Sequence, residues 1–236
     1  MTAIRSRVAT ALAALAFGMG AAQAHNVWLV PDAQGAYLVQ FGGHEGKLEE
    51  FNSSKLTSVT AYDRRGRKID VATQAATDGV RVKPEREPAM LAAEFDNGFF
   101  SKTDSSAMVN KPMDENPGAT SGVHAMKFHK TVLQWGLIAR KELGQTFEIV
   151  GTQSKDPQAG KPMQVKVLKD GKPIAGVRLS LGEDGTPVTS AADGTATVTP
   201  VEGRNQLLAI IRMPVQGDPK TTQRSYEYLF AFQTHD

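Results

Sequence analysis

The sequence predicts an all-β protein made of two β-sandwich-like domains after a cleaved signal peptide. Short runs rich in β-branched and aromatic residues alternate with clusters of Gly, Pro, Asn and Asp, and the runs are regularly spaced. No stretch carries a sustained apolar repeat at the helical period, although one short helical turn is expected within 49–56. Strands joined by tight turns therefore account for nearly the whole chain.

The first 24 residues have the composition of a secretory signal peptide. A basic start is followed by the short apolar run 8–19 and by the small-residue triplet Ala22-Gln23-Ala24. We expect the signal peptide 1–24 to be cut after Ala24, so that His25 becomes the first residue. No later apolar run is long enough to span a bilayer. The sequence thus predicts an exported, soluble, periplasmic protein without stable membrane insertion.

Charge and cysteine content exclude several classes of function. The chain has 27 Lys and Arg and 25 Asp and Glu. Loss of Arg5 and Arg7 with the signal peptide leaves 25 basic and 25 acidic residues, so the exported chain is formally neutral. A neutral chain without a basic run predicts no nucleic-acid partner. The chain contains 0 Cys, which excludes disulfides, thiolate metal sites and a cysteine nucleophile.

The first domain is predicted over 25–152. A loop rich in Ser, Asn, Pro and Gly interrupts it at 103–122, and loops of this length are usually functional or disordered. The strands expected in this domain are 26–30, 36–41, 57–62, 68–71, 80–83, 90–95, 98–102, 124–133 and 146–150.

The second domain is predicted over 160–236, after a linker-like segment at 151–161. Asp170-Gly171 and Asp193-Gly194 mark two of its turns. The expected strands are 163–168, 177–181, 195–198, 206–212 and 225–232. Five strands at this spacing are typical of a small Ig-like β-sandwich.

The residues best suited to act as metal ligands lie at the start of the exported chain. A residue His25 with a free α-amine offers two nitrogen ligands, because an amine with a pKa of about 8 and an imidazole with a pKa of about 6.5 are both available near neutral pH. If 26–30 and 36–41 pair as a hairpin, His44 lies beside His25. This arrangement is that of a histidine brace, which suits Cu(II) or Ni(II). The alternative is that His44 is an ordinary turn residue.

A third imidazole could come from the strand that follows the long loop. His124 and His129 are five residues apart, so their side chains lie on opposite faces of a strand and at most one joins the site. His124 is preferred, sharing a face with Met126 and Phe128. The predicted metal ligands are therefore His25, His44 and His124, while Glu45, Glu49 and Glu50 are candidates for orienting an imidazole.

No catalytic signature supports an enzyme. The chain lacks a Gly-x-Ser-x-Gly elbow, a phosphate-binding glycine loop, a His-Glu-x-x-His motif and a dinucleotide fingerprint. We therefore predict that the protein is not an enzyme, with a copper-dependent oxidase as a minor alternative because a histidine brace can activate oxygen.

Several motifs resemble one known family across nearly the whole exported chain. They are Ala-His-x-x-Trp-Leu-x-Pro at 24–31, Gly-His-Glu at 43–45, and the segments 99–112, 143–150 and 160–176. Together they resemble a periplasmic domain-of-unknown-function family grouped with the periplasmic component of cobalt/nickel ABC-type transport. The resemblance implies handling of Co(II) or Ni(II), with His25 and His44 in the opening motif.

The sequence and the resemblance together predict a periplasmic transition-metal binding protein. It would bind Ni(II) or Co(II), or Cu(II), and would capture the ion or deliver it to a membrane metal-uptake system. The alternative is a non-metal periplasmic interaction module that binds a protein or glycan partner, with contacts from Trp28, Trp135, Phe99 and Phe100.

Overall fold

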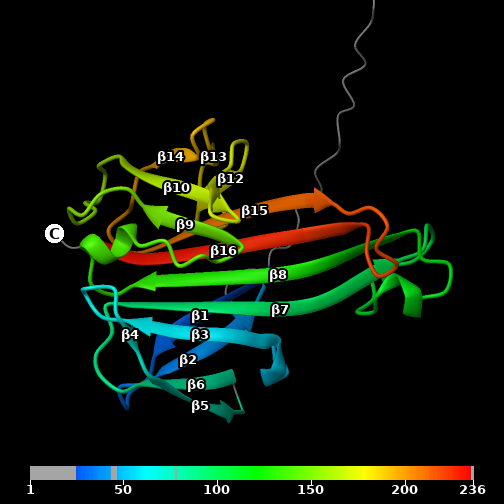
Figure 1. Cartoon of the computed structure of the whole chain (residues 1–236), viewed down its shortest axis with the longest axis horizontal. Coiled ribbons are helices and arrows are strands. Elements are labelled where there is room, and N and C mark those ends of the chain that lie inside the picture. The colour runs from blue at the N-terminus through cyan, green and yellow to red at the C-terminus, as the bar shows by residue number, and fades with distance from the viewer. Residues whose placement is uncertain (1–24, 44–46, 78, 235–236) are drawn as a thin grey trace, which may run out of the picture.

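The computed structural model describes residues 25–43, 47–77 and 79–234, and its fold is all-β, as the sequence predicts (Figure 1). The helical elements in these ranges are short 3-10 turns at Ser53–Lys55, Met113–Glu115 and Leu137–Arg140. No helix in the described ranges has the length and apolar character needed to cross a bilayer. The strands are β1 (Asn26–Pro31), β2 (Tyr37–Gly42), β3 (Leu56–Tyr62), β4 (Lys68–Ile69), β5 (Val71–Ala76), β6 (Gly79–Pro84), β7 (Met90–Lys102), β8 (Ser121–Val132), β9 (Phe147–Gly151), β10 (Met163–Lys169), β11 (Lys172–Pro173), β12 (Arg178–Leu181), β13 (Val188–Thr189), β14 (Thr195–Val198), β15 (Gly203–Pro214) and β16 (Gln223–Thr234).

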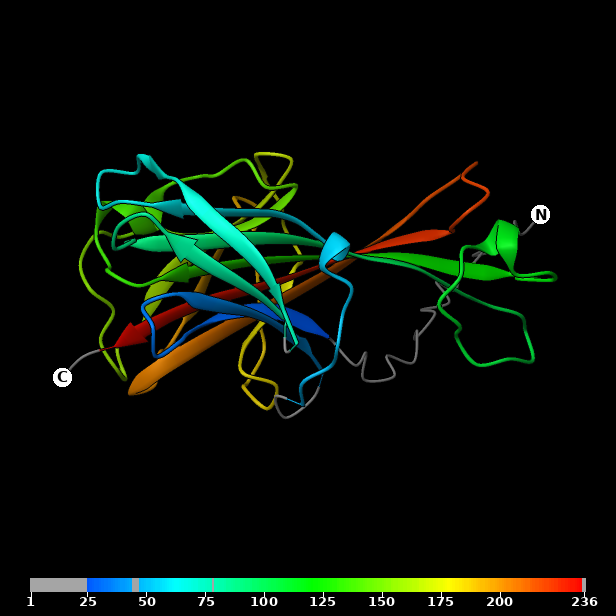
Figure 2. The same ribbon diagram turned by 90° about the horizontal axis from the view of Figure 1, so that it is seen from below.

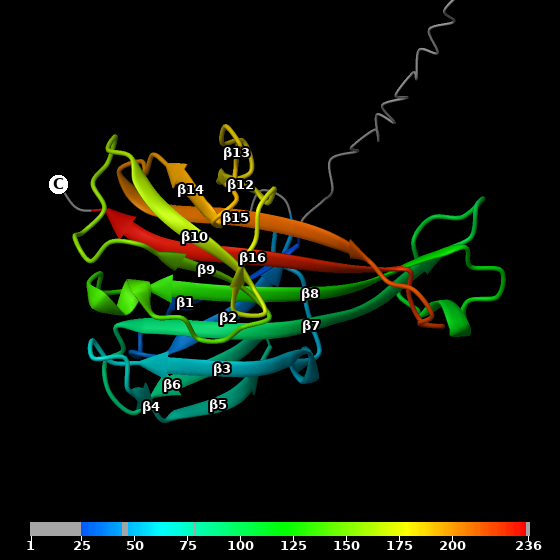
Figure 3. The same ribbon diagram turned by 45° about the horizontal axis from the view of Figure 1, so that its top comes forward.

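The strands form three sheets stacked as three layers (Figures 1 and 3). The central sheet has eight strands in the order β13-β12-β15-β16-β8-β7-β3-β4. One outer layer has the order β1-β2-β6-β5, and we call it the N-terminal sheet. The other outer layer contains β11-β10-β14, with β9 pairing with β10. The central sheet is therefore covered on both faces.

The central sheet runs through both halves of the chain. Strands β8 and β16 pair in parallel without interruption from Val123 opposite Gln223 to Val132 opposite Phe232. One sheet thus contains strands from both 25–152 and 160–236, and the domain boundary between these ranges stays a prediction.

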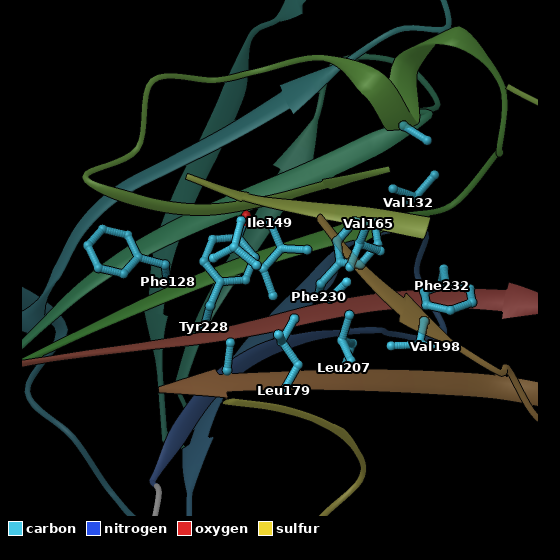
Figure 4. Close-up of a cluster of buried hydrophobic side chains, with 14 of the residues drawn as sticks. Phe128, Val132, Ile149, Val165, Leu179, Val198, Leu207, Tyr228, Phe230 and Phe232 are labelled. Atoms are coloured by element: carbon cyan, nitrogen blue, oxygen red, sulfur yellow. The ribbon is translucent and has the colours of Figure 1, made fainter. Parts of the chain in front are cut away.

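Alternation of side chains along the central strands builds two separate cores. In β7, Leu91, Ala93 and Phe95 pack against the N-terminal sheet, whereas Met90 faces the other outer layer. The larger core lies between the central sheet and β9, β10 and β14 (Figure 4). Its aromatic centre includes Phe128 and Tyr228, whose rings stack with centroids 6.4 Å apart.

In two regions of the first half of the chain, the number of strands differs from the prediction. The runs expected at 90–95 and 98–102 are one strand, because the register shifts at a bulge between Asp96 and Gly98 and then continues. Gly98 has φ +89 and its N–H donates to Asp96 Oδ1 at 2.8 Å. The single strand expected at 68–71 is divided, because β4 ends at Ile69 and β5 begins at Val71. Strand β5 then continues to Ala76 through Ala, Thr and Gln, which give no alternation of large apolar residues.

The ends of β7 and β8 project beyond the layers together with the β15–β16 connection (Figures 2 and 3). The long loop between β7 and β8 folds back onto this projection. Ser101 and Val109 form a bridge, Ser101 Oγ donates to the Lys111 carbonyl at 2.8 Å, and the Met113 N–H donates to the Lys220 carbonyl at 3.0 Å. Backbone hydrogen bonds therefore hold the predicted loop against its neighbours.

A buried ion pair joins β8 to β9. Lys130 Nζ lies 2.7 Å from Glu148 Oε1 and donates to the Ile149 carbonyl at 3.0 Å. Glu148 also accepts from the N–H groups of Leu143 and Gly144, at 2.7 and 3.1 Å. Every charge in this group is therefore hydrogen-bonded, as burial requires.

We expect Lys130→Met to lower the free energy of unfolding by about 3–5 kcal/mol, because it leaves the Glu148 carboxylate buried without its cation. The double variant Lys130→Met/Glu148→Leu should recover much of this loss. Chemical denaturation of each variant measures the effect. Lys172→Met on exposed β11 is the control, with an expected change within about 0.5 kcal/mol. Equal stability of the Lys130 and Lys172 variants would contradict the role of the pair.

A second prediction concerns His129, whose side chain is fully buried beside Thr131. Burial lowers the pKa of His129 to about 3. Below about pH 6.5, His129 is therefore protonated in the unfolded chain but stays neutral in the folded chain down to about pH 3. The free energy of unfolding should fall as the pH is lowered between these two values. The slope contributed by His129 is at most about 1.4 kcal/mol per pH unit.

The variant His129→Leu cannot bind this proton. The unfolding free energy of the wild type minus that of His129→Leu should therefore fall steadily from pH 6.5 to pH 4, whichever protein is more stable at pH 6.5. A difference that is the same at both pH values would show that His129 does not stay neutral in the fold.

Candidate functional site

The hairpin predicted from the strands 26–30 and 36–41 is confirmed. Strands β1 and β2 pair antiparallel with Asn26 opposite Gly42, which brings His25 beside Gly43. A Cβ atom on Gly43 would lie 3.2 Å from His25 Nε2 and 3.7 Å from Glu49 Oε1. His44 itself lies outside the described residues, as does Glu45. The chain therefore brings the residue before His44 against the His25 ring.

Glycine at position 42 is required by a close backbone approach. A Cβ atom there would lie 2.1 Å from the carbonyl oxygen of Lys47, because the chain returns along β2 after the turn. The Gly43 N–H donates to this same carbonyl at 3.1 Å, and the Glu49 N–H donates to the Phe41 carbonyl at 2.9 Å. These bonds fix Glu49 next to the end of β2.

The His25 ring is held on two sides. It stacks on Phe41 with centroids 5.7 Å apart, and Phe41 in turn stacks on Phe95 at 4.9 Å. His25 Nε2 lies 2.9 Å from Glu49 Oε1. An ionised carboxylate only accepts hydrogen bonds, so Nε2 carries the proton and Nδ1 of the neutral ring keeps its lone pair. Nδ1 is the nitrogen that can close a chelate ring with the α-amine of the same residue.

The structure does not bring His124 to His25. His124 shares its face of β8 with Met126 and Phe128, which belong to the larger core, whereas His25 packs on Phe41 in the core under the N-terminal sheet. The two imidazoles therefore lie on opposite sides of the central sheet. His124 Nε2 is 2.8 Å from Asp96 Oδ1 and its ring stacks on Phe99 with centroids 4.2 Å apart.

Among the residues that the structure describes, no three His, Asp or Glu side chains converge closely enough to hold a metal ion. His25 and Glu49 make up a pair in the described part of the chain. A complete site at this end of the hairpin would require further ligands, such as the α-amine of His25 and the predicted ligand His44.

A groove of about 370 Å³ opens on the other face of the hairpin. Asn26, Trp28 and Val30 line one wall, alternating along β1 with the residues that face the core. Strand β15 supplies Arg204 and Gln206. The sequence does not reveal the β15 residues, because they lie about 175 positions from β1 and carry no motif. Glu183, from the loop after β12, also lines the groove and was missed for the same reason.

A smaller polar cleft of about 120 Å³ lies at the edge of the larger core. Glu94 and Gln145 line it, and burial raises the pKa of the Glu94 carboxyl. The Tyr228 hydroxyl donates to Gln145 Oε1 at 2.7 Å, and Gln145 Nε2 donates to the Ala93 carbonyl at 3.2 Å. The cleft floor is thus fixed by buried hydrogen bonds.

The four aromatic residues of the alternative interaction surface are all at least partly buried. Trp28 Nε1 donates to Gln40 Oε1 at 3.0 Å, and Trp135 packs edge-on against Phe232 with centroids 5.4 Å apart. Phe99 stacks on His124, and Phe100 is half-buried. The large apolar side chains that are exposed in the described ranges lie elsewhere, at Leu48, Met108, Val109, Leu137, Val201 and Met213.

Comparison with known proteins places the chain in a family. Residues 22–212 match the model named domain of unknown function DUF4198. An uncharacterized protein of Haemophilus influenzae is 33% identical over 227 residues, which cover 96% of this chain and 97% of that protein. No solved structure matches the chain. Neither comparison names a cobalt or nickel transport role or an enzymatic activity. The chain belongs to the DUF4198 family.

Proposed function

We propose that this protein is a periplasmic transition-metal binding protein that captures Ni(II) or Co(II), or Cu(II), and delivers it to a membrane metal-uptake system. The observation that carries the proposal is the pairing of His25 Nε2 with Glu49 Oε1 at 2.9 Å. A carboxylate at Nε2 would leave the Nδ1 lone pair free to bind a metal ion, as carboxylates behind metal-bound imidazoles do.

The position of strand β1 supports a metal site at the N-terminus. The first paired residue is Asn26, so cleavage after Ala24 leaves a single residue, His25, ahead of the ladder. The ring of this residue is already held between Phe41 and Glu49. A chelating amine and imidazole would therefore be fixed in place before the metal arrives, which lowers the entropic cost of binding.

The proposed ligands are the α-amine and Nδ1 of His25 together with His44. His124 was the third ligand expected from the sequence, and its place on the opposite side of the central sheet argues for a separate role. Nitrogen ligands of this kind suit Ni(II), Co(II) and Cu(II). The metal is cargo in this proposal, so no catalytic step is assigned to it.

We expect the exported chain that begins at His25 to bind one equivalent of metal tightly. Adding one residue before His25 removes the primary amine, and His44→Ala removes the second imidazole, so each change should weaken binding by at least tenfold. Glu49→Gln should weaken it by about 10–100-fold, the usual effect of losing the partner of a metal-bound imidazole. Isothermal titration calorimetry with Ni(II), Co(II), Cu(II) and Zn(II) measures these affinities.

His124→Ala is the matched control, because it removes an imidazole on the far side of the central sheet, and it should leave the affinity unchanged. Equal affinity of the extended and native N-termini would refute the site. Binding should also weaken below about pH 6, because imidazole ligands must be deprotonated.

A further inference from the structure

Strand β5 is an unprotected edge of the N-terminal sheet (Figures 1 and 3). It pairs with β6 over six consecutive residue pairs without a register shift, and it is the last strand in its sheet. Its sequence, Val-Ala-Thr-Gln-Ala-Ala, contains no charged residue and no proline, and the four residues 72–75 are exposed. Natural edges are normally blocked by charge, proline, a bulge or a covering segment.

The other edge strands that the structure describes are short or covered. Strands β4, β11 and β13 are two residues long, and β14 has four. Strand β9 is buried along its whole length, and β1 packs against β8 and β16. In the described part of the molecule, β5 therefore offers the longest open hydrogen-bonding edge.

The hydrogen bonds of β5 show which of its backbone groups are open. The Glu85 N–H donates to the Asp70 carbonyl at 2.9 Å, so these opposite residues form a hydrogen-bonded pair. Such pairs alternate along an antiparallel ladder. Residues 72, 74 and 76 therefore bond to β6, whereas the N–H and C=O groups of Val71, Thr73 and Ala75 point away from it. Pro84, opposite Val71, fits this pattern because that position needs no N–H.

We propose that β5 pairs with β5 of a second copy of this chain, antiparallel across a two-fold axis at Thr73. In this register Thr73 lies opposite the partner's Thr73, and Val71 lies opposite the partner's Ala75. All six open backbone groups on each copy are then used, forming six hydrogen bonds. The two N-terminal sheets become one continuous sheet of eight strands.

The side chains are compatible with this register. Opposite residues of an antiparallel pair share a face, and Val71, Thr73 and Ala75 all lie on one face of β5. Asp70 lies opposite the partner's Ala76, so no like charges meet. Thr–Thr pairs across strands are favourable. The strand is thus complementary to itself in hydrogen bonding, in charge and in side-chain size.

The length of the strand sets the strength of the contact. Stable complexes bury about 1,200–2,000 Å², which is more than two six-residue edges supply. The dimer is therefore reversible and depends on concentration. The pairing is also closed, because both copies use the same edge, so it does not propagate into a fibre.

The first test uses charge at the symmetry axis. Thr73→Lys and Thr73→Glu each place two like charges directly opposite one another, so each variant alone should have an association constant at least tenfold below that of the wild type. An equimolar mixture of the two should associate again, because Lys then faces Glu. Sedimentation equilibrium of the exported chain up to about 1 mM measures the constants, and circular dichroism checks that the variants are folded.

Thr197→Lys, on exposed β14, is the matched control and should dimerise as the wild type does. A wild type that is monomeric at about 1 mM would overturn the proposal and leave the edge for an extended segment of a different protein. Association of Thr73→Lys at the wild-type constant would overturn it as well.

A second test uses the absence of cysteine from the chain. Opposite Cα atoms of a hydrogen-bonded pair are about 5.5 Å apart, which a disulfide can span. Under mild oxidation Thr73→Cys should form a covalent dimer at least tenfold faster than Thr197→Cys. Equal rates for the two variants would exclude the register centred on Thr73.

Discussion

The parallel pairing of β8 with β16 is the constraint on which the rest of the molecule depends. Parallel neighbours cannot be joined by a tight turn, so the chain between them must cross a face of the sheet. That crossing contains β9, β10 and β14, which cover the larger core. Strands β1, β2, β5 and β6, which precede β8 in the chain, form the N-terminal sheet over the opposite face. The larger core therefore includes one face of this strand pair, whereas the smaller core lies between the N-terminal sheet and β3, β4 and β7 of the same central sheet.

Sequence patterns predicted the strands better than their assembly. Strands with apolar alternation, such as β10 and β14, have nearly the expected limits. Strand β5 was missed beyond Val71, because Ala, Thr and Gln give neither alternation nor high apolar content and its place is set by pairing with β6. The β8–β16 pairing joins residues 100 positions apart, so no local pattern could reveal it.

The same distinction applies to the candidate site. His25 and the turn before His44 come together through a hairpin, which is a local structure that turn residues and alternation encode. The alternation of side chains along β8 correctly predicted that His124 shares a face with Phe128. Alternation alone cannot show which outer layer covers that face. Glu49 was one of three acidic residues near the turn. Glu49 is the one that pairs with His25, because its backbone N–H donates to the Phe41 carbonyl and holds it next to the end of β2. The sequence does not show this hydrogen bond.

The two proposals use opposite edges of the same sheet. In the order β1-β2-β6-β5, the His25 site lies at the β1 edge and the self-pairing strand at the β5 edge. Pairing two copies through β5 would place the two β1 strands at the ends of an eight-stranded sheet, about 34 Å apart at about 4.8 Å per strand. Neither site would be covered, and no ligand could pass from one copy to the other. The proposed metal site and the proposed dimer contact therefore would not overlap, so each can be tested in a variant that leaves the other intact.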